Sequence, residues 1–158
     1  PSGLRLASIA TSEARIAGAN LFTLKRANRG AVGVFSTKIG DLYMAMAGMR
    51  EKTAVEAGFD VVVGTAETLD KHPGSMPDAT PQEVKLVFQR ESGKLVGGQA
   101  CGGVSVGELA NVVAALIQGG MTADEVAIFQ MGTHPALTAS PIAYPLANAA
   151  EMAVRNMR

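Results

Sequence analysis

The sequence predicts an α+β fold in which helices flank a mostly antiparallel β-sheet. Segments with strand character fill the middle of the chain, helical segments fill its last third, and the two kinds do not alternate strictly. The 158 residues are enough for one hydrophobic core, and 47% of them are hydrophobic, which excludes an intrinsically disordered chain. A doubly wound parallel sheet is the weaker alternative.

One helix and one hairpin are predicted in the first third of the chain. Small and apolar residues over Ser8–Leu21 indicate the helix. Two apolar runs follow, Val32–Ile39 and Leu42–Ala47, and the turn pair Gly40-Asp41 separates them. Both runs are therefore expected to be strands.

A short helix, a strand and a long loop are predicted next. The helix covers Arg50–Ala57 and ends at Gly58, because glycine adopts the left-handed C-terminal conformation without a steric cost. The β-branched run Phe59–Gly64 indicates a strand. Three prolines fall within Asp70–Pro81, and proline restricts pairing in a sheet, so this segment is expected to be a connecting loop.

The second hairpin has the clearest pattern in the chain. Val84, Leu86 and Phe88 alternate with polar residues, and only Val87 breaks the period of two. This alternation is typical of a half-buried antiparallel strand. A Ser-Gly turn leads to a returning strand over Leu95–Cys101.

Three helices are predicted in the last third. Two Ser/Thr residues followed by a glutamate three positions later indicate capping boxes, Ser105 with Glu108 and Thr122 with Glu125. The last helix is expected to start at one of two proline-containing pairs, Ser140-Pro141 or Tyr144-Pro145. Four of its residues form the predicted buried face: Leu146, Ala149, Ala150 and Ala153.

Composition excludes several classes of function. The formal net charge is zero, which argues against a nucleic-acid-binding protein. No apolar run approaches the ~18 residues that span a bilayer, so no membrane association is expected. The single cysteine excludes a disulfide framework and a cysteine-based zinc site, and it indicates an intracellular, cytoplasmic protein. Neither a G-x-G-x-x-G fingerprint nor a P-loop occurs.

Few residues are candidates for chemistry. Cys101 has no basic residue close in sequence that would lower its pKa, so a buried structural thiol is the favoured interpretation over a nucleophile. His72 lies in the proline-rich loop and is expected to be solvated. His134 precedes Pro135 between two predicted helices and is either a loop residue or a functional one. No spacing of ligands indicates a metal site.

Several segments, in their serial order, resemble the C-terminal region of the flavin-dependent pyridine nucleotide-disulfide oxidoreductases, especially the NADH oxidase and coenzyme A-disulfide reductase branch. Leu6–Leu21 resembles the last helix of their FAD-binding domain. Thr37–Gly58 and Val84–Gly103 are similar to parts of their dimerisation domain, and His134-Pro135 falls where the family has a His-Pro loop.

The resemblance implies the function of a dimerisation domain. It divides the chain into the terminal helix and linker of an FAD-binding domain, 1–30, and the dimerisation domain, 31–158. The expected partners are a second copy, giving a homodimer, and FAD- and NAD-binding domains absent from this sequence. The full-length enzyme would use FAD and NAD(P)H, whereas the fragment alone would bind no cofactor and be inactive. The opening residues Pro1-Ser2-Gly3, without an initiator methionine, also predict a piece of a longer polypeptide.

The resemblance also implies site residues. Leu6, Ala7 and Ser8 are predicted to face the flavin of the intact enzyme, at the start of the first helix. His134 is predicted to act in trans near the partner's flavin, and Tyr43 and Tyr144 are candidates for the same substrate cleft or for the core.

The sequence departs from the pattern of the family at the His-Pro loop. The glutathione and lipoamide reductases have a glutamate after this motif that orients the histidine, whereas 136–141 contains no acid. This favours an oxidase-like or coenzyme A-type parent over one with a His-Glu dyad. Two other functions stay open: an independent small-ligand-binding α+β domain without catalysis, and an autonomous enzyme that uses Cys101.

Overall fold

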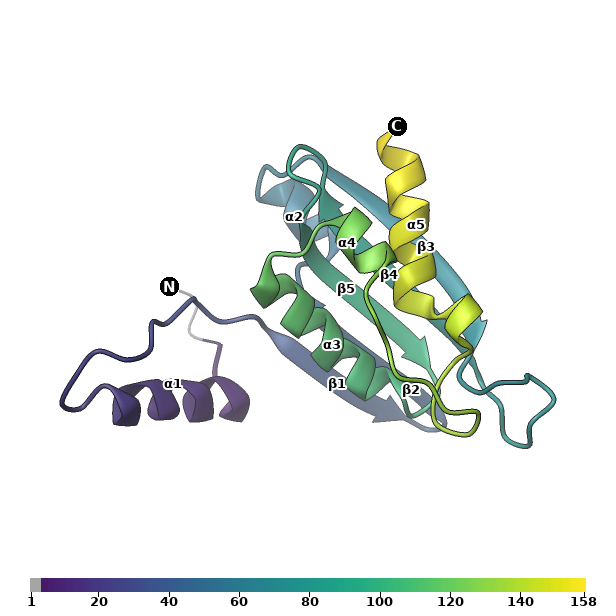
Figure 1. The fold of residues 1–158 in the computed structure, drawn as a ribbon, viewed down its shortest axis with the longest axis horizontal. Coiled ribbons are helices and arrows are strands. Elements are labelled where there is room, and N and C mark those ends of the chain that lie inside the picture. The colour runs from purple at the N-terminus through teal and green to yellow at the C-terminus, as the bar shows by residue number, and fades with distance from the viewer. Residues whose placement is uncertain (1–3) are drawn as a thin grey trace. The chain divides into compact units, whose positions relative to one another are not determined.

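The computed structural model describes residues 4–158. They form two compact units, which meet in sequence between Gly33 and Val34. The first contains one helix, α1 (Ala7–Ala19), and the second contains a β-sheet with the remaining helices (Figure 1). Each unit is described by itself below.

The first unit is a helix followed by a structured turn. No residue of α1 is buried. Asn20 organises the turn that follows, because its Oδ1 accepts hydrogen bonds from the N–H groups of Lys25 (2.9 Å) and Arg26 (3.0 Å). Its Nδ2 donates to the carbonyl oxygen of Arg26 at 2.7 Å. The helix matches the predicted element to within two residues at each end.

The second unit is built on a five-stranded antiparallel sheet, which confirms the predicted fold class. Its strand order is β1-β2-β5-β4-β3, and every neighbouring pair is antiparallel. The strands are β1 (Val34–Ile39), β2 (Leu42–Gly48), β3 (Val61–Leu69), β4 (Pro81–Gln89) and β5 (Leu95–Gly102).

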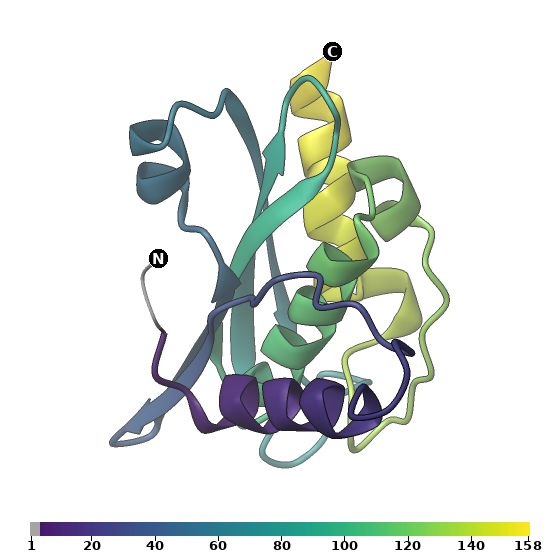
Figure 2. The ribbon, with the colours of Figure 1, turned by 90° about the vertical axis from the view of Figure 1, so that its left-hand side faces the viewer.

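Helices cover one face of this sheet. The helical elements on this face are α3 (Val106–Gly119), α4 (Ala123–Ala127), the 3₁₀ turn η1 (Pro141–Ala143) and α5 (Pro145–Met157). Helix α3 lies over β1, β2 and β5, and α5 lies over β3 and β4 (Figures 1 and 2). The predicted buried face of α5 is confirmed, since Leu146, Ala149, Ala150 and Ala153 are all fully buried.

The alternation in β4 follows from this arrangement. Val84, Leu86 and Phe88 are fully buried on the helical side of the strand. Val87 points to the other face, yet it is also fully buried. It pairs with Gly97, where an added Cβ would lie 1.8 Å from the backbone oxygen of Met49. The chain around Met49 therefore covers this corner of the second face.

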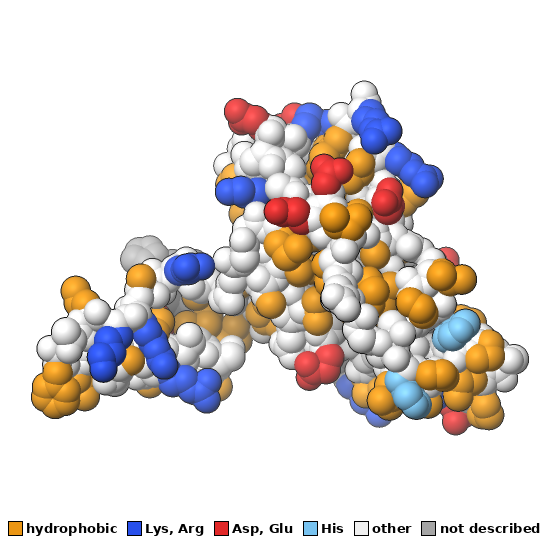
Figure 3. Space-filling model, in the orientation of Figure 1, with side chains coloured by type: hydrophobic (Ala, Val, Ile, Leu, Met, Phe, Trp, Pro, Cys, Tyr) orange, Lys and Arg blue, Asp and Glu red, His pale blue; other side chains and the backbone are white. Residues whose placement is uncertain are grey.

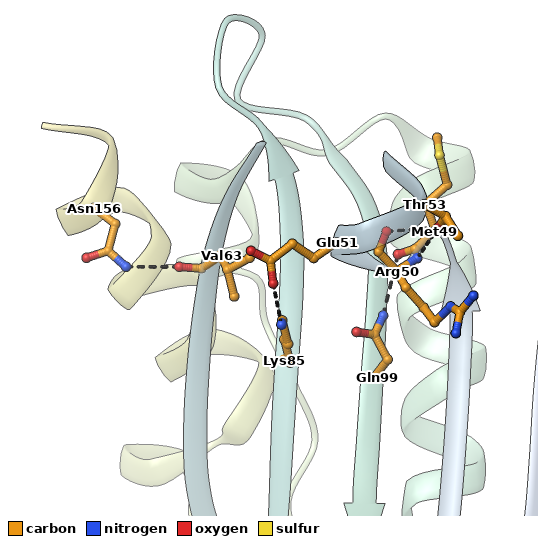
Figure 4. Close-up of polar contacts among 8 residues, drawn as sticks. All are labelled: Met49, Arg50, Glu51, Thr53, Val63, Lys85, Gln99 and Asn156. Carbon is orange, nitrogen blue, oxygen red and sulfur yellow. Dashed lines mark hydrogen bonds and ion pairs between the residues drawn. The ribbon is translucent and has the colours of Figure 1, made fainter. Parts of the chain in front are cut away.

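Helix α2 (Glu51–Glu56) lies on the side of the sheet opposite α3, α4 and α5 (Figure 2). Two polar contacts hold the segment to the strands. The Lys85 ammonium contacts the Glu51 carboxylate at 2.5 Å, and the Gln99 Nε2 donates to the Met49 carbonyl at 3.4 Å (Figure 4).

Two details of the sequence-based prediction are wrong. Strand β3 continues to Leu69, beyond the predicted end at Gly64, because its backbone stays paired with β4 as far as Pro81. The capping box at Ser105 does not form. The Ser105 hydroxyl donates to the Gln82 side chain instead, at 3.2 Å.

The second capping box is confirmed at the start of α4. The Glu125 N–H donates to the Thr122 hydroxyl at 3.4 Å, and the Thr122 N–H donates to the Glu125 carboxylate at 2.8 Å. Both proposed starts of the last helix are used, the first by η1 and the second by α5. No helix among residues 4–158 is long and apolar enough to cross a membrane.

Candidate functional site

His134 lies in an exposed loop between α4 and η1, and local hydrogen bonds hold its conformation. The His134 carbonyl accepts the N–H groups of Leu137 and Thr138, each at 3.0 Å. The Thr138 hydroxyl accepts the N–H of His134 at 3.0 Å. The imidazole itself accepts the N–H of Ala136 at Nδ1, at 3.2 Å. This loop is therefore a closed turn that begins at the histidine.

The structure brings the loop of the second histidine against this turn. The N–H of His72 donates to the carbonyl of Pro135 at 3.0 Å. Both histidines are exposed, and both histidine side chains are visible on the face that Figure 3 shows. The sequence analysis did not predict this meeting, because no pattern relates the β3–β4 connection to the His-Pro loop.

Polar contacts also fix the β3–β4 loop. The buried Asp70 carboxylate accepts the N–H of Thr80 at 2.7 Å. The Lys71 ammonium donates to the carbonyls of Pro77 (3.2 Å) and Asp78 (3.0 Å). The described part of the chain contains no group of three or more His, Cys, Asp or Glu residues that could hold a metal ion. The pair of loops is thus a hydrogen-bonded surface without a metal site.

No carboxylate orients His134 within the described residues. Among residues 4–158, the one hydrogen bond to its ring comes from the backbone N–H of Ala136. Ala139, in the stretch where the related reductases have their acid, is buried at 3% exposure. The contact that orients the imidazole therefore comes from the main chain and not from an acid.

The two tyrosines have different environments. Tyr144 is buried, and its ring packs edge-on against Phe129 with centroids 5.8 Å apart. Burial raises the pKa of its hydroxyl. Tyr144 also borders a small cavity of about 110 Å³ together with Gln82 and Thr138. Tyr43 is half-buried on β2, with the Lys38 ammonium 5.1 Å from its ring centroid.

Cys101 lies on the second face of the sheet, in a broad groove of about 610 Å³. It is half-buried and pairs with Met44 on β2 and with Glu83 on β4. Apolar side chains dominate the groove, among them Phe35, Met44 and Met46, and Lys85 is the one cation that lines it among the described residues. Met44 and Met46 lie on β2, within the segment Leu42–Ala47 that the sequence predicts as a strand.

The predicted flavin-facing residues lie at the start of α1. Leu6 is the N-cap residue, Ala7 and Ser8 are exposed, and no side chain caps the first turn. The first turn contains no acidic residue. Its N–H groups and the positive end of the helix dipole are therefore available to an electron-rich group.

Comparisons with known proteins match this architecture. The family described as pyridine nucleotide-disulphide oxidoreductase, dimerisation domain, matches residues 34–142. A curated NADH oxidase from Methanocaldococcus jannaschii is 28% identical over 148 residues, which cover 94% of this chain and 32% of that protein.

Solved structures give the same result. An NAD-dependent persulfide reductase from A. fulgidus superposes with a TM-score of 0.84 at 27% identity, over 96% of this chain and 27% of that one. Reduced CoADR-RHD from Bacillus anthracis superposes with a TM-score of 0.86 at 25% identity, over 96% of this chain and 27% of that one. The chain thus spans about a third or less of the length of each relative.

Proposed function

The chain belongs to the dimerisation-domain family of the pyridine nucleotide-disulphide oxidoreductases, and from this premise we propose that it joins two subunits of a larger flavoenzyme and completes the active site of the partner subunit. The observation that carries the proposal is the family match, which runs from the first residue of β1 into η1. The proposed parent is an NADH oxidase or coenzyme A-disulfide reductase type of enzyme in the cytoplasm.

Exposed apolar side chains support self-association. Ile128 and Ile142 are 81% and 88% exposed beside the helices, and Ile39 is 64% exposed on β1. Apolar side chains also gather around the His-Pro loop (Figure 3). Clustered apolar surface of this kind marks interaction sites, and closed homodimers use the same patch on both subunits.

FAD and NAD(P)H are the proposed cofactors of the full-length enzyme. When bound, the flavin accepts a pair of electrons from NAD(P)H and passes them on to the substrate. The start of α1 fits a place beside an electron-rich ring, because no side chain occupies its first-turn donors. Leu6, Ala7 and Ser8 are the residues proposed to hold the flavin there. Oxygen, a disulfide, a persulfide or another protein is the proposed oxidant.

Sedimentation tests the dimerisation function directly. We expect the 158-residue chain to sediment as a dimer at micromolar concentration. Two charge-introducing variants, Ile142→Lys and Ile39→Lys, compare the helical side with the β1 edge. Both positions are exposed, so neither variant should unfold the domain, and the one within the interface should yield monomer. A strict monomer for the unmodified chain would contradict the proposal.

The second candidate is an independent small-ligand-binding domain without catalysis. The groove of about 610 Å³ that contains Cys101 favours it, since ligand sites are usually concave and mostly apolar. A monomeric chain that binds a small apolar molecule, with loss of binding in Met46→Lys, would support this candidate over the first.

A further inference from the structure

The small cavity beside Tyr144 lies between the start of α3 and the loop that joins α4 to η1. It has a volume of about 110 Å³, and its walls come from β4, the first turns of α3, loop residues 137–139 and the start of α5. Glu108 and Leu137 line the cavity and are exposed, so it is open to solvent on their side. An apolar cavity of about 150 Å³ holds benzene, so this one has room for a molecule of about five non-hydrogen atoms.

Tyr144 lines the cavity and has an unpaired hydroxyl. The residue is 9% exposed, and its hydroxyl forms no hydrogen bond with any residue among 4–158. Burial alone raises the pKa of this hydroxyl, as expected for a group without a charged or hydrogen-bonded neighbour. Buried polar groups in proteins are nearly always hydrogen-bonded, to protein, water or ligand. The Tyr144 hydroxyl therefore needs a partner that the described part of the chain does not supply.

Gln82 is a second buried polar residue of the cavity wall, and part of its hydrogen-bonding capacity is unused. It is 3% exposed. Its Nε2 donates to the Thr68 hydroxyl at 3.3 Å, and its Oε1 accepts from the Ser105 hydroxyl at 3.2 Å. A carboxamide has two N–H donors and can accept two bonds, so one donor and one acceptor position of Gln82 stay free within residues 4–158. Gln82 and Tyr144 thus offer donors and acceptors to the same cavity.

The charge of the walls limits what the cavity can bind. Glu108 is the one charged residue that lines it among residues 4–158, and its carboxylate already accepts from the Asn111 amide at 3.1 Å. A charged ligand group beside Tyr144 and Gln82 would lose its water without an opposite charge to compensate for the loss. The walls therefore favour a neutral molecule.

We propose that this cavity is a binding site for a small neutral molecule that carries a hydroxyl or carbonyl oxygen on a short apolar body. The oxygen would bond to Tyr144 and Gln82, and the apolar body would pack against Leu109 and Val112. Because loop residues 137–139 form one wall, a bound molecule would also join this loop to α3. The cavity is formed within one chain, so the inference is independent of the proposed dimerisation.

Titration of the 158-residue chain with tert-butanol, a neutral alcohol of matching size, tests the site. NMR follows the side-chain amide of Gln82 and the backbone amide of Ala139, which also lines the cavity. We expect both signals to shift and to saturate at millimolar concentrations, as is usual for so small a ligand. Acetate is similar in size but charged, and we expect no saturable shift with it. Shifts that stay proportional to the tert-butanol concentration, or saturable binding of acetate, would overturn the inference.

Two substitutions and a matched control locate the binding. Tyr144→Phe removes the hydroxyl and keeps the ring, so the affinity should fall about fivefold, the effect of one hydrogen bond. Tyr43→Phe makes the same change on β2, outside the cavity wall, and should leave the affinity unchanged. Val112→Phe fills the cavity and should abolish binding, with the fold checked by the same spectra. Equal affinities for Tyr144→Phe and the unmodified chain, or binding retained in a folded Val112→Phe, would contradict the assignment.

Discussion

At the scale of single residues, Gly64 shows how closely the helical layer approaches the sheet. The glycine is buried on β3, beneath α5. A Cβ added there would lie 1.8 Å from the carbonyl oxygen of Ala149 and 2.7 Å from the nitrogen of Ala153. Both atoms belong to the helix backbone, which cannot yield as a flexible side chain does. The absence of a side chain at Gly64 therefore sets the distance between α5 and β3.

The variant Gly64→Ala should destabilise the domain severely. Overpacking typically costs about 1–3 kcal/mol, and we expect at least the upper part of that range because the clash is with backbone. Urea unfolding measures the change. Gly107→Ala is the matched control, since an added Cβ in α3 meets nothing within 4 Å and alanine favours helix by up to about 1 kcal/mol. Equal stabilities for the two variants would contradict this account of the packing.

At the scale of elements, α4 depends on its N-terminal cap. It has only five residues, and a helix of that length gains little from its own hydrogen bonds. The backbone N–H of Thr122 and then its hydroxyl bind the Glu125 carboxylate, and these contacts, aided by Lys94, lower the pKa of Glu125 below its ordinary 4.5. Desolvation of the carboxyl opposes this shift.

This shift predicts how the cap responds to acid. Because the folded pKa lies below the unfolded one, the stabilisation is complete above about pH 4.5 and is lost as the pH falls through the folded value. In Thr122→Val, which removes the hydroxyl and keeps the backbone N–H, the pKa of Glu125 should rise only part of the way toward 4.5, as a carbon-13 NMR titration of its carboxyl would show. Glu125→Gln, which keeps an acceptor but does not titrate, should lose the acid dependence. An unchanged Glu125 titration in Thr122→Val would show that the Thr122 hydroxyl does not contribute to the shift.

The two capping boxes also show what local sequence determines and what it does not. Thr122 and Glu125 find each other within one turn, so the pattern was sufficient to predict the cap. Ser105 has the same spacing from Glu108, but folding brings Gln82 beside it from β4, and its hydroxyl bonds there. The alternation in β4 likewise predicted the strand, whereas the burial of Val87 depends on the distant segment at Met49.

In the candidate site too, the sequence predicted features that are close along the chain and missed contacts that folding creates. The His-Pro pair itself singled out His134 as a candidate, and the lack of an acid in 136–141 argued against a His-Glu dyad. Neither the contact with Ala136 nor the neighbouring His72 loop was predictable. The first depends on the exact turn conformation, and the second on a tertiary contact between segments more than sixty residues apart.

At the scale of the whole molecule, the chain has no nucleotide-binding fingerprint of its own. We expect the 158-residue chain to bind no FAD, because its sequence lacks the glycine-rich fingerprint that would hold the pyrophosphate. Gel filtration with added FAD, followed by a visible absorbance spectrum, measures this. A yellow protein peak with stoichiometric flavin would contradict the expectation, and a full-length enzyme that stays yellow under the same conditions is the control.

The strand order has a consequence for how the chain folds. The hairpins β1–β2 and β4–β5 each close across a short turn, and β3 pairs with the next strand along the chain. The seam between β2 and β5 is different, since it joins Gly48 to Gly97 across α2, β3 and β4. Closing a long loop costs chain entropy before its contacts can repay it, and such pairings slow folding. The two halves of the sheet are therefore expected to form first, and their union at this seam to limit the folding rate.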